Sequence, residues 1–342
     1  MSHLRKGRAG AVAGVAVAAL ALGTLSACGG SAGASSGDGG AKVTLNLVSY
    51  STPQTAFEEI IKAFQDTPEG KNVDFKQSYG ASGDQSRAVA AGQPADVVEF
   101  ALAPDIKRLV DADMVAPTWD HGQYKGFVTK SVTSIIVRKG NPKNIHNWDD
   151  LIKPGIEVLN ANPFTSGGAR WNVMAAYGSQ IQQGKTKAQA TQYLNTLFHH
   201  IPVQDESART ALQTFTQGKG DALLSYENEA IFAQQNGQAV DYVVPDDTIL
   251  IENPVAVTKN SSHPVQAAAF VKFLYSSTAQ KIFSEKGFRP VVAGTSATTF
   301  PTPTGLFTID DFGGWDKVMT VFFDPDKGVV AKIEQGLGVS TS

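Results

Sequence analysis

The chain has 342 residues and a formal net charge of −3, with 29 basic and 32 acidic side chains. This length allows a large core or two domains, and the balanced charge without a basic stripe argues against a nucleic-acid partner. A single cysteine excludes an internal disulfide framework and makes thiolate metal sites or paired-cysteine redox chemistry implausible.

The N-terminal residues are typical of a secretory signal. Three basic side chains precede an apolar run at residues 11–25, which is too short and too weakly apolar for a membrane span. Cys28 then follows Leu-Ser-Ala, a context that resembles the lipobox of bacterial lipoproteins, in which the cysteine is lipidated. We therefore expect residues 1–27 to be a lipoprotein signal peptide and the Gly/Ser-rich residues 28–41 a flexible tether. An ordinary secreted protein with an incidental cysteine is the alternative.

Strands and helices are predicted to alternate in the next part of the chain, which is typical of a parallel sheet covered on both faces. Alternating or short apolar runs predict strands at 42–50, 72–80 and 95–101. Apolar residues at helical spacing predict helices at 55–67, 82–92 and 104–115.

The same alternation resumes beyond residue 130. A strong strand is predicted at 131–138 and ends in a Gly-Asn-Pro turn. Further strands are expected at 156–163, 201–205 and 221–227. Helices are expected at 147–155, 167–183, 187–200, 207–218 and 228–237.

Residues 239–258 predict strands and residues 264–287 predict two helices, which leaves too few strands for a third sheet. We therefore predict an α/β fold of two lobes, each a mainly parallel sheet flanked by helices. Lobe one is expected to take residues 42–130, lobe two 131–244, and the rest of lobe one with C-terminal helices 245–342. Ligands of open α/β sheets lie at the carboxyl ends of the strands, so we expect a ligand in the cleft between the lobes.

Three loops rich in small residues each open a predicted helix, at residues 79–85, 162–171 and 204–212. A helix N-terminus exposes unpaired N–H groups and a partial positive charge, and glycine lets a ligand approach them closely. Taken singly, each loop is explained by ordinary capping. Together they indicate an anion site built without lysine.

The segment NPFTSGGARW at residues 162–171 carries a more specific resemblance, together with segments that begin at Val137, Tyr226 and Leu306. These segments resemble the bacterial sulfate-binding proteins of ABC importers, and the similarity extends over essentially the whole mature chain. The resemblance implies a type II periplasmic-binding fold that binds sulfate in the hinge cleft and delivers it to an ABC permease. We expect a monomer on the outer face of the cytoplasmic membrane, in the periplasmic or cell-wall space, anchored through Cys28.

The resemblance also implies which groups touch the anion. They are hydroxyl and main-chain N–H groups of Ser82, Ser166, Gly167, Gly168 and Ala208. A tryptophan completes the family's site, but Tyr226 stands at that position here. A phenol donates one hydrogen bond with a different reach and angle. This departure leaves thiosulfate, whose larger terminal atom is a poorer acceptor, as the alternative ligand.

A site made of donors alone fits sulfate, which is fully deprotonated at neutral pH, and disfavours phosphate, whose hydroxyl would stay unpaired. We therefore expect the nearby carboxylates to point away from the anion; they belong to Asp84, Asp205, Glu206 and Glu227. Arg170 and Arg209 are expected either to reinforce the main-chain groups from behind or to form ion pairs. Phe164, where the family usually has lysine, is expected to change only the rim.

No nucleophile and base stand in a recognisable motif, so we predict a binding protein rather than an enzyme, without a metal or cofactor. Two other hypotheses use the same cleft. One is a secreted enzyme, which turnover of esters or thiosulfate would reveal, and the other is an anion sensor coupled to a membrane kinase.

Overall fold

The computed structural model describes residues 42–341. The predictions for the signal peptide, the tether and Cys28 concern residues outside this range. The strands are β1 Val43–Tyr50, β2 Val73–Gly80, β3 Val97–Glu99, β4 Phe127–Arg138, β5 Val158–Ala161, β6 Val203–Asp205, β7 Ala222–Tyr226, β8 Val240–Val243, β9 Asp247–Val257, β10 Arg289–Pro290 and β11 Gly305–Phe307. The α-helices are α1 Gln54–Gln65, α2 Ser82–Ala90, α3 Ala103–Asp111, α4 Gly167–Gln182, α5 Lys187–His199, α6 Ala208–Thr216, α7 Glu227–Gln235, α8 Pro264–Leu274, α9 Ser277–Glu285, α10 Gly314–Phe322 and α11 Val329–Gly336.

The strands form one mixed sheet in the order β2-β1-β3-β9-β4-β7-β5-β6. We call β1, β2 and β3 with the helices that follow them lobe one, and β5, β6 and β7 with α4 to α7 lobe two. Within each lobe the pairs β1–β2, β1–β3, β5–β6 and β5–β7 are parallel. The α/β fold with flanking helices is thus confirmed.

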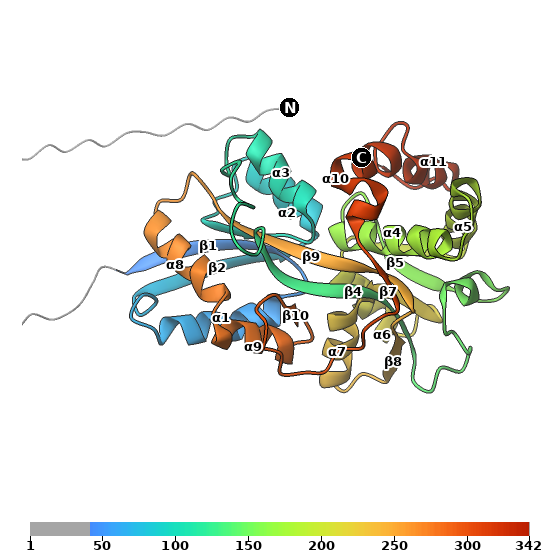
Figure 1. The fold of residues 1–342 in the computed structure, drawn as a ribbon, viewed down its shortest axis with the longest axis horizontal. Helices are drawn as coiled ribbons and strands as arrows, with labels where there is room; N and C mark the ends of the chain where they lie inside the picture. The colour runs from blue at the N-terminus through green and yellow to red at the C-terminus, as the bar shows by residue number, and fades with distance from the viewer. Residues whose placement is uncertain (1–41, 342) are drawn as a thin grey trace, which may run out of the picture. The chain divides into compact units, whose positions relative to one another are not determined.

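Two long antiparallel strands join the lobes. Residues up to Val132 of β4 pair with β9, and the residues from Thr133 onward pair with β7 and β8. The far end of β9 pairs with β3 of lobe one. Figure 1 shows β4 and β9 running between the two groups of strands. The expected lobe limits near residues 130 and 244 lie next to these two strands and remain predictions.

Helix α4 lies in the interior of lobe two. Its residues from Gly167 to Gln180 are all buried, which identifies it as a core helix rather than an amphipathic surface helix. The indole of Trp171 packs edge-on against Trp315, with ring centroids 4.6 Å apart. Its first turn is therefore held in place by packing on every side.

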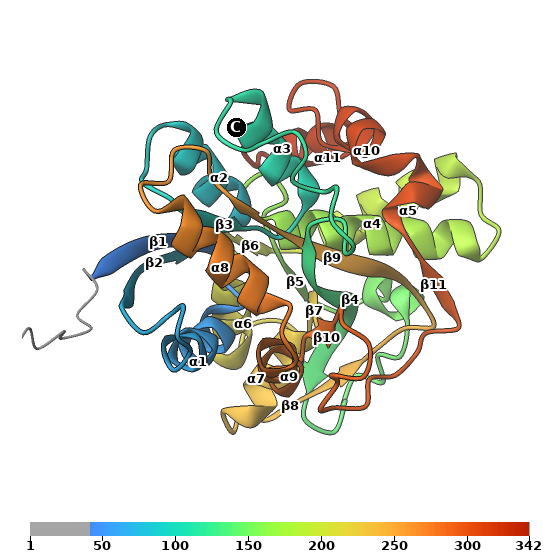
Figure 2. The ribbon, with the colours of Figure 1, turned by 60° about the vertical axis from the view of Figure 1, so that its left-hand side comes forward.

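The helix predicted at 147–155 is a 3₁₀ helix at Trp148–Ile152. The C-terminal segment was predicted only as helices; in the structure a second 3₁₀ helix at Ile309–Phe312 precedes α10. Helix α10 packs against α3, and α11 packs against α5. Figure 2 shows both helices beside α3 and α4. Among the helices of residues 42–341, none is long and apolar enough to cross a membrane.

Candidate anion-binding site

A small cavity lies where the carboxyl end of β1 meets the starts of α2, α4, α6 and α7. Its lining residues are small or hydroxylated: Tyr50, Ser51, Thr52, Gly80, Ala81, Ser82, Ala101, Ser166, Gly168, Ser207, Ala208 and Tyr226. The centre of a water molecule can move over about 10 Å³ inside it. This is close to the minimum that holds one water molecule. None of these lining residues is charged.

Three helix starts supply main-chain donors to the cavity. Ser82 and Ala208 are the first residues of α2 and α6, and Gly168 is the second residue of α4. The hydrogen bonds found in residues 42–341 include none donated by the main-chain N–H of these three residues. N–H groups at such positions have no partner inside their own helix, so they are available to an acceptor in the cavity.

The side chains of two serines cap these helices. Ser166 Oγ accepts from the N–H of Ala169 at 3.3 Å, and Ser207 Oγ accepts from Thr210 at 3.2 Å. Each hydroxyl thereby satisfies one main-chain donor. Ser166 keeps its hydroxyl hydrogen for another acceptor, because none of the bonds found in the described residues is donated by Ser166 Oγ.

The Ser82 hydroxyl has another partner than the one expected. It donates to Asp105 Oδ2 at 2.6 Å and accepts from the N–H of Ala101 at 3.0 Å. Asp105 is fully buried and also accepts from Arg108 at 2.9 Å. Because the Ser82 hydroxyl already donates its hydrogen to Asp105, the donor that Ser82 can provide to the cavity is its main-chain N–H.

Gly167 does not line the cavity, in contrast to the other five predicted residues. A Cβ at this position would lie 2.3 Å from Cδ2 of Leu102 and 2.9 Å from Cβ of Ala101. Glycine is therefore needed here because lobe one presses against the start of α4. A Cβ on Gly168 would meet Cε1 of Tyr226 at 3.4 Å, which is a far milder contact.

Three buried hydroxyls of the lining have no hydrogen-bond partner within the described residues: those of Tyr50, Thr52 and Tyr226. Tyr226 was expected from the sequence, whereas Tyr50 and Thr52 were missed. The signal that could have found them is topological, since both lie at the carboxyl end of a parallel strand. Burial raises the pKa of Tyr50 and of Tyr226 well above the usual value, so both phenols keep their proton and act as neutral donors.

The four carboxylates near the loops lie outside the lining, in agreement with expectation. Asp84 pairs with Arg87, and Glu227 pairs with Arg289 at 2.8 Å. Asp205 Oδ1 accepts from Thr214 at 3.0 Å, and Glu206 takes part through its carbonyl oxygen, which accepts from Thr165.

One further buried carboxyl, that of Glu99 on β3, accepts from Ser49 Oγ at 2.6 Å. Burial raises the pKa of Glu99 well above its usual value, which favours the uncharged acid. This reduces the repulsion that an anion in the cavity would meet.

Comparison with known proteins assigns the family. Residues 45–289 match the family model of the bacterial extracellular solute-binding proteins. The chain belongs to that family. A sulfate-binding protein of Synechococcus elongatus (strain ATCC 33912 / PCC 7942 / FACHB-805) is 42% identical over 94% of this chain and 95% of the relative. A thiosulfate-binding protein of Pseudomonas aeruginosa is 33% identical over 84% and 90%. The structure of the sulfate-binding protein SubI from Mycobacterium tuberculosis H37Rv aligns with a TM-score of 0.79 and 44% identity, covering 81% of this chain and 98% of that one.

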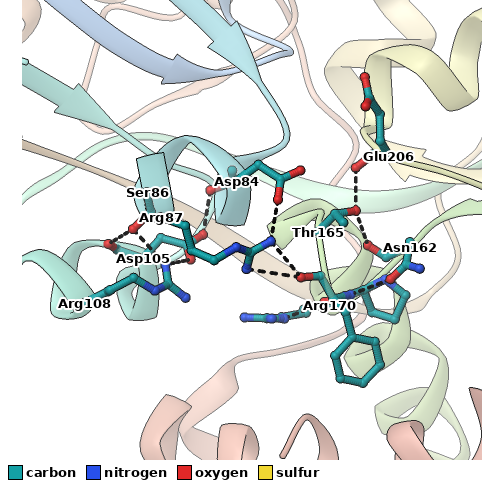
Figure 3. A network of polar contacts seen from close by, with 12 residues as sticks. Asp84, Ser86, Arg87, Asp105, Arg108, Asn162, Thr165, Arg170 and Glu206 are labelled. Carbon is teal, nitrogen blue, oxygen red and sulfur yellow. Dashed lines mark hydrogen bonds and ion pairs between the residues drawn. The ribbon is translucent and has the colours of Figure 1, made fainter. Parts of the chain in front are cut away.

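The lobes of this solute-binding protein are joined by hydrogen bonds at the cavity rim. Gly83 N–H donates to the Thr165 carbonyl at 3.0 Å. Both terminal nitrogens of Arg87 reach the Phe164 carbonyl at 3.4 Å. Figure 3 shows the Arg87 guanidinium between Asp84 and the loop before α4. The structure therefore presents the two lobes in contact around the cavity.

Arg209 and Arg170 occupy different environments. Arg209 forms a two-point ion pair with the buried Glu229 at 2.9 and 2.8 Å, and it donates to the Thr52 carbonyl of lobe one at 3.0 Å. Arg170 is buried and donates to the Pro163 carbonyl at 2.6 Å, in the loop that precedes α4. Burial lowers the pKa of Arg170 to about 10, which leaves it charged at neutral pH. Arg209 thus matches the ion-pair alternative, and Arg170 stands behind the second-lobe loop.

Two tryptophans of the core have structural hydrogen bonds. Trp148 and Trp171 are buried, and their indole N–H groups donate to the Asp247 and Ala101 carbonyls at 2.7 and 2.8 Å. The described residues contain no group of three or more His, Cys, Asp or Glu side chains placed to hold a metal ion.

Proposed function

We propose that this solute-binding protein captures sulfate in the cavity and delivers it to an ABC permease, with thiosulfate as the alternative ligand. The sulfate- and thiosulfate-binding relatives support this choice of anion. The protein acts as a monomeric carrier, and the transfer of the anion requires no chemical change of it.

The observation that carries the proposal is the chemical character of the lining. The cavity offers unpaired N–H groups and unpaired hydroxyls, and no lining residue carries a charge. A buried donor without a partner costs about 1–3 kcal/mol. A guest that brings only acceptors removes that cost at several points at once, and a tetrahedral dianion brings four acceptor atoms.

Electrostatic stabilisation comes from helix ends and not from a contacting cation. Ser82, Gly168 and Ala208 lie at the starts of three helices, where aligned peptide dipoles place a partial positive charge. The buried charge of Arg170, in the first turn of α4, adds to this field. The anion is thereby held without a basic side chain in contact with it.

Ligand binding favours closure because both lobes contribute donors. Ser82 belongs to lobe one, and Gly168 and Ala208 belong to lobe two, so the anion makes its full set of contacts only when the lobes meet. The hydrogen bonds of Gly83 and Arg87 across the cavity rim also stabilise the closed state. The permease would then recognise the closed form.

The experiment that tests the anion is calorimetry on protein freed of endogenous ligand. Sulfate, thiosulfate, molybdate and phosphate are titrated in turn at pH 8, where phosphate keeps one proton. We expect sulfate to bind most tightly, thiosulfate next, and phosphate at least 100-fold more weakly, since its hydroxyl lacks an acceptor. Heat from phosphate alone, or from none of the four anions, would contradict the proposal.

The lipid anchor is a separate part of the proposal. Residues 1–27 would be removed, and Cys28 would carry the lipid that holds the protein at the outer face of the cytoplasmic membrane. Radiolabelled palmitate should enter the wild-type protein, and Cys28→Ser should lose the label and release the protein into the soluble fraction. A membrane-bound, unlabelled Cys28→Ser variant would contradict anchoring through this residue.

A further inference from the structure

The lobe-one wall of the cavity contains two buried hydroxyls that form no ordinary hydrogen bond with the rest of the described residues. Tyr50 and Thr52 are 3% and 2% exposed, and neither hydroxyl oxygen has a hydrogen-bond partner in the part of the chain that the structure describes. Most buried polar side-chain atoms have such a partner. Unpaired hydroxyls in a cavity wall therefore point to a ligand as the missing partner.

These two hydroxyls lie close together and close to Tyr226. Burial raises the pKa of Tyr50 well above its usual value, Glu99 and Tyr226 add to the rise, and a side-chain hydrogen-bonding interaction with Thr52 lowers it. The Tyr50 and Thr52 hydroxyls are therefore neighbours, although their geometry falls outside that of an ordinary hydrogen bond. The rings of Tyr50 and Tyr226 are 6.2 Å apart between centroids and tilted by 57°. The hydroxyls of Tyr50, Thr52 and Tyr226 thus form one group, which we call the hydroxyl wall.

The position of Thr52 is fixed from the opposite lobe. Its carbonyl oxygen accepts from Arg209 Nη2 at 3.0 Å, and Arg209 is held by Glu229. Closure of the lobes therefore orients the segment that carries Thr52. A donor oriented in advance loses little entropy when the anion binds.

The hydroxyl wall differs chemically from the helix starts. N–H groups at a helix start are fixed in direction and add the charge of the helix dipole, whereas a hydroxyl turns about its C–O bond and adds none. An anion with one weak acceptor atom loses the least binding free energy when that atom faces the hydroxyls and its stronger acceptors face the helix starts. In thiosulfate that atom is the terminal sulfur, which accepts hydrogen bonds more weakly than oxygen does.

We propose that Tyr50 and Thr52 are specificity-determining contact residues, whose hydroxyls donate to one vertex of the bound anion and favour oxygen over sulfur there. This inference rests on the proposed function, because it concerns the same cavity and the same two anions. It adds two side chains from the end of β1 to the ligand contacts predicted from the helix starts.

The test removes each hydroxyl with little change of shape. Tyr50→Phe and Thr52→Val are titrated with sulfate and with thiosulfate by calorimetry, and their ligand-induced rise in Tm is measured alongside. We expect sulfate affinity to fall by about 10-fold or more in each variant and thiosulfate affinity by no more than about 3-fold. Thr52→Ser keeps the hydroxyl and should retain wild-type preference, which separates the hydroxyl from the methyl group.

Matched controls come from hydroxyls outside the cavity. Thr133 Oγ1 on β4 is also buried and unpaired but does not line the cavity, so Thr133→Val should leave both affinities unchanged. The Tyr79 phenol donates to Gln77 Oε1 at 2.7 Å, so Tyr79→Phe serves as the second control.

The outcomes separate the inference from the proposed function. Unchanged sulfate affinity in Tyr50→Phe and Thr52→Val, with wild-type protein that binds sulfate, would overturn the inference alone. Equal losses for sulfate and thiosulfate would also overturn it, since the hydroxyls would then not discriminate. Wild-type protein that binds neither anion would overturn the proposed function and this inference with it.

Discussion

The two walls of the cavity are built by different means. The lobe-two wall consists of helix starts, where main-chain N–H groups of Gly168 and Ala208 lie beside the capping serines. The lobe-one wall has one helix start, at Ser82, and takes its other donors from Tyr50 and Thr52 after β1. Main-chain donors are rigid and insensitive to side-chain substitution, whereas hydroxyl donors are lost by a single change. We therefore expect lobe two to determine affinity for any tetrahedral dianion, and the hydroxyls to determine which anion is preferred.

The largest expected effect concerns the residue that connects the walls. Arg209 pairs at two points with Glu229, which is completely buried, and donates to the Thr52 carbonyl. Arg209→Ala leaves a buried carboxylate without its partner, so the free energy of unfolding should fall by about 3–5 kcal/mol. Urea denaturation of ligand-free protein measures this. The double variant Arg209→Ala/Glu229→Gln should recover much of the loss, and a single variant as stable as wild type would contradict the role of the pair.

Gly167→Ala tests the contact between the walls. The added methyl group would meet Leu102 and Ala101 of lobe one, and these contacts exist only when the lobes meet. We expect sulfate affinity to fall by about 10- to 100-fold, because overpacking costs about 1–3 kcal/mol. The Tm of the ligand-free, open protein should stay unchanged. Gly168→Ala is the matched comparison, since its methyl group would meet Tyr226 at 3.4 Å and Ser166 Oγ at 3.5 Å, both in lobe two. Equal losses of affinity in the two variants would show that the glycine at 167 is not required for closure of the lobes.

Glu334 is a titratable residue behind the lobe-two wall, and its substitution does not alter lobe one. Glu334 on α11 is buried and accepts from Gln204 Nε2 at 2.8 Å, on the strand that leads to Ser207. Burial raises the pKa of Glu334 from its ordinary 4.5 to about 7. Because the pKa of Glu334 is higher in the folded state than in the unfolded state, its protonation stabilises the folded protein. This contribution to the free energy of unfolding is complete below pH 4.5 and is lost as the pH rises through about 7.

Glu334→Gln should abolish this pH dependence. Relative to the variant, the wild-type free energy of unfolding should fall by about 1–3 kcal/mol between pH 4.5 and pH 7.5. Denaturant unfolding at several pH values measures the difference. Glu69→Gln, at an exposed position, is the control and should follow wild type. Parallel curves for wild type and Glu334→Gln would mean that the carboxyl group is hydrated in solution.

Tyr226→Phe tests the phenol donor of the lobe-two wall. Its phenol is completely buried and unpaired in the described residues, so its removal should weaken sulfate binding by about 10-fold. Calorimetry with sulfate and thiosulfate measures the change. Unchanged sulfate affinity with altered thiosulfate affinity would reverse the ranking of the two ligands.

The sequence predicted the lobe-two wall better than the lobe-one wall, and the reason is physical. A Ser-Gly-Gly segment before an apolar helix reports a main-chain geometry, which depends on local residues alone. The tasks of Tyr50 and Thr52 depend instead on which strand end faces which helix, and that is set by β4 and β9 far along the chain. The contact of Gly167 with Leu102 escaped sequence analysis for the same reason, because Leu102 comes from the opposite lobe; the contact of Gly167 with the anion remains a prediction.

Ser82→Ala carries the smallest expected effect on binding and separates the two kinds of donor within one residue. The Ser82 hydroxyl is already engaged with Asp105 and Ala101, so the main-chain N–H that faces the cavity survives the substitution. Sulfate affinity should change by less than about 3-fold, while the free energy of unfolding falls by about 1–2 kcal/mol, because Asp105 loses a buried donor and keeps only Arg108. Calorimetry and urea denaturation on the same preparation distinguish the two quantities. A 10-fold loss of affinity with unchanged stability would place the hydroxyl on the anion, and lobe one would then bind with three side-chain hydroxyls in place of two.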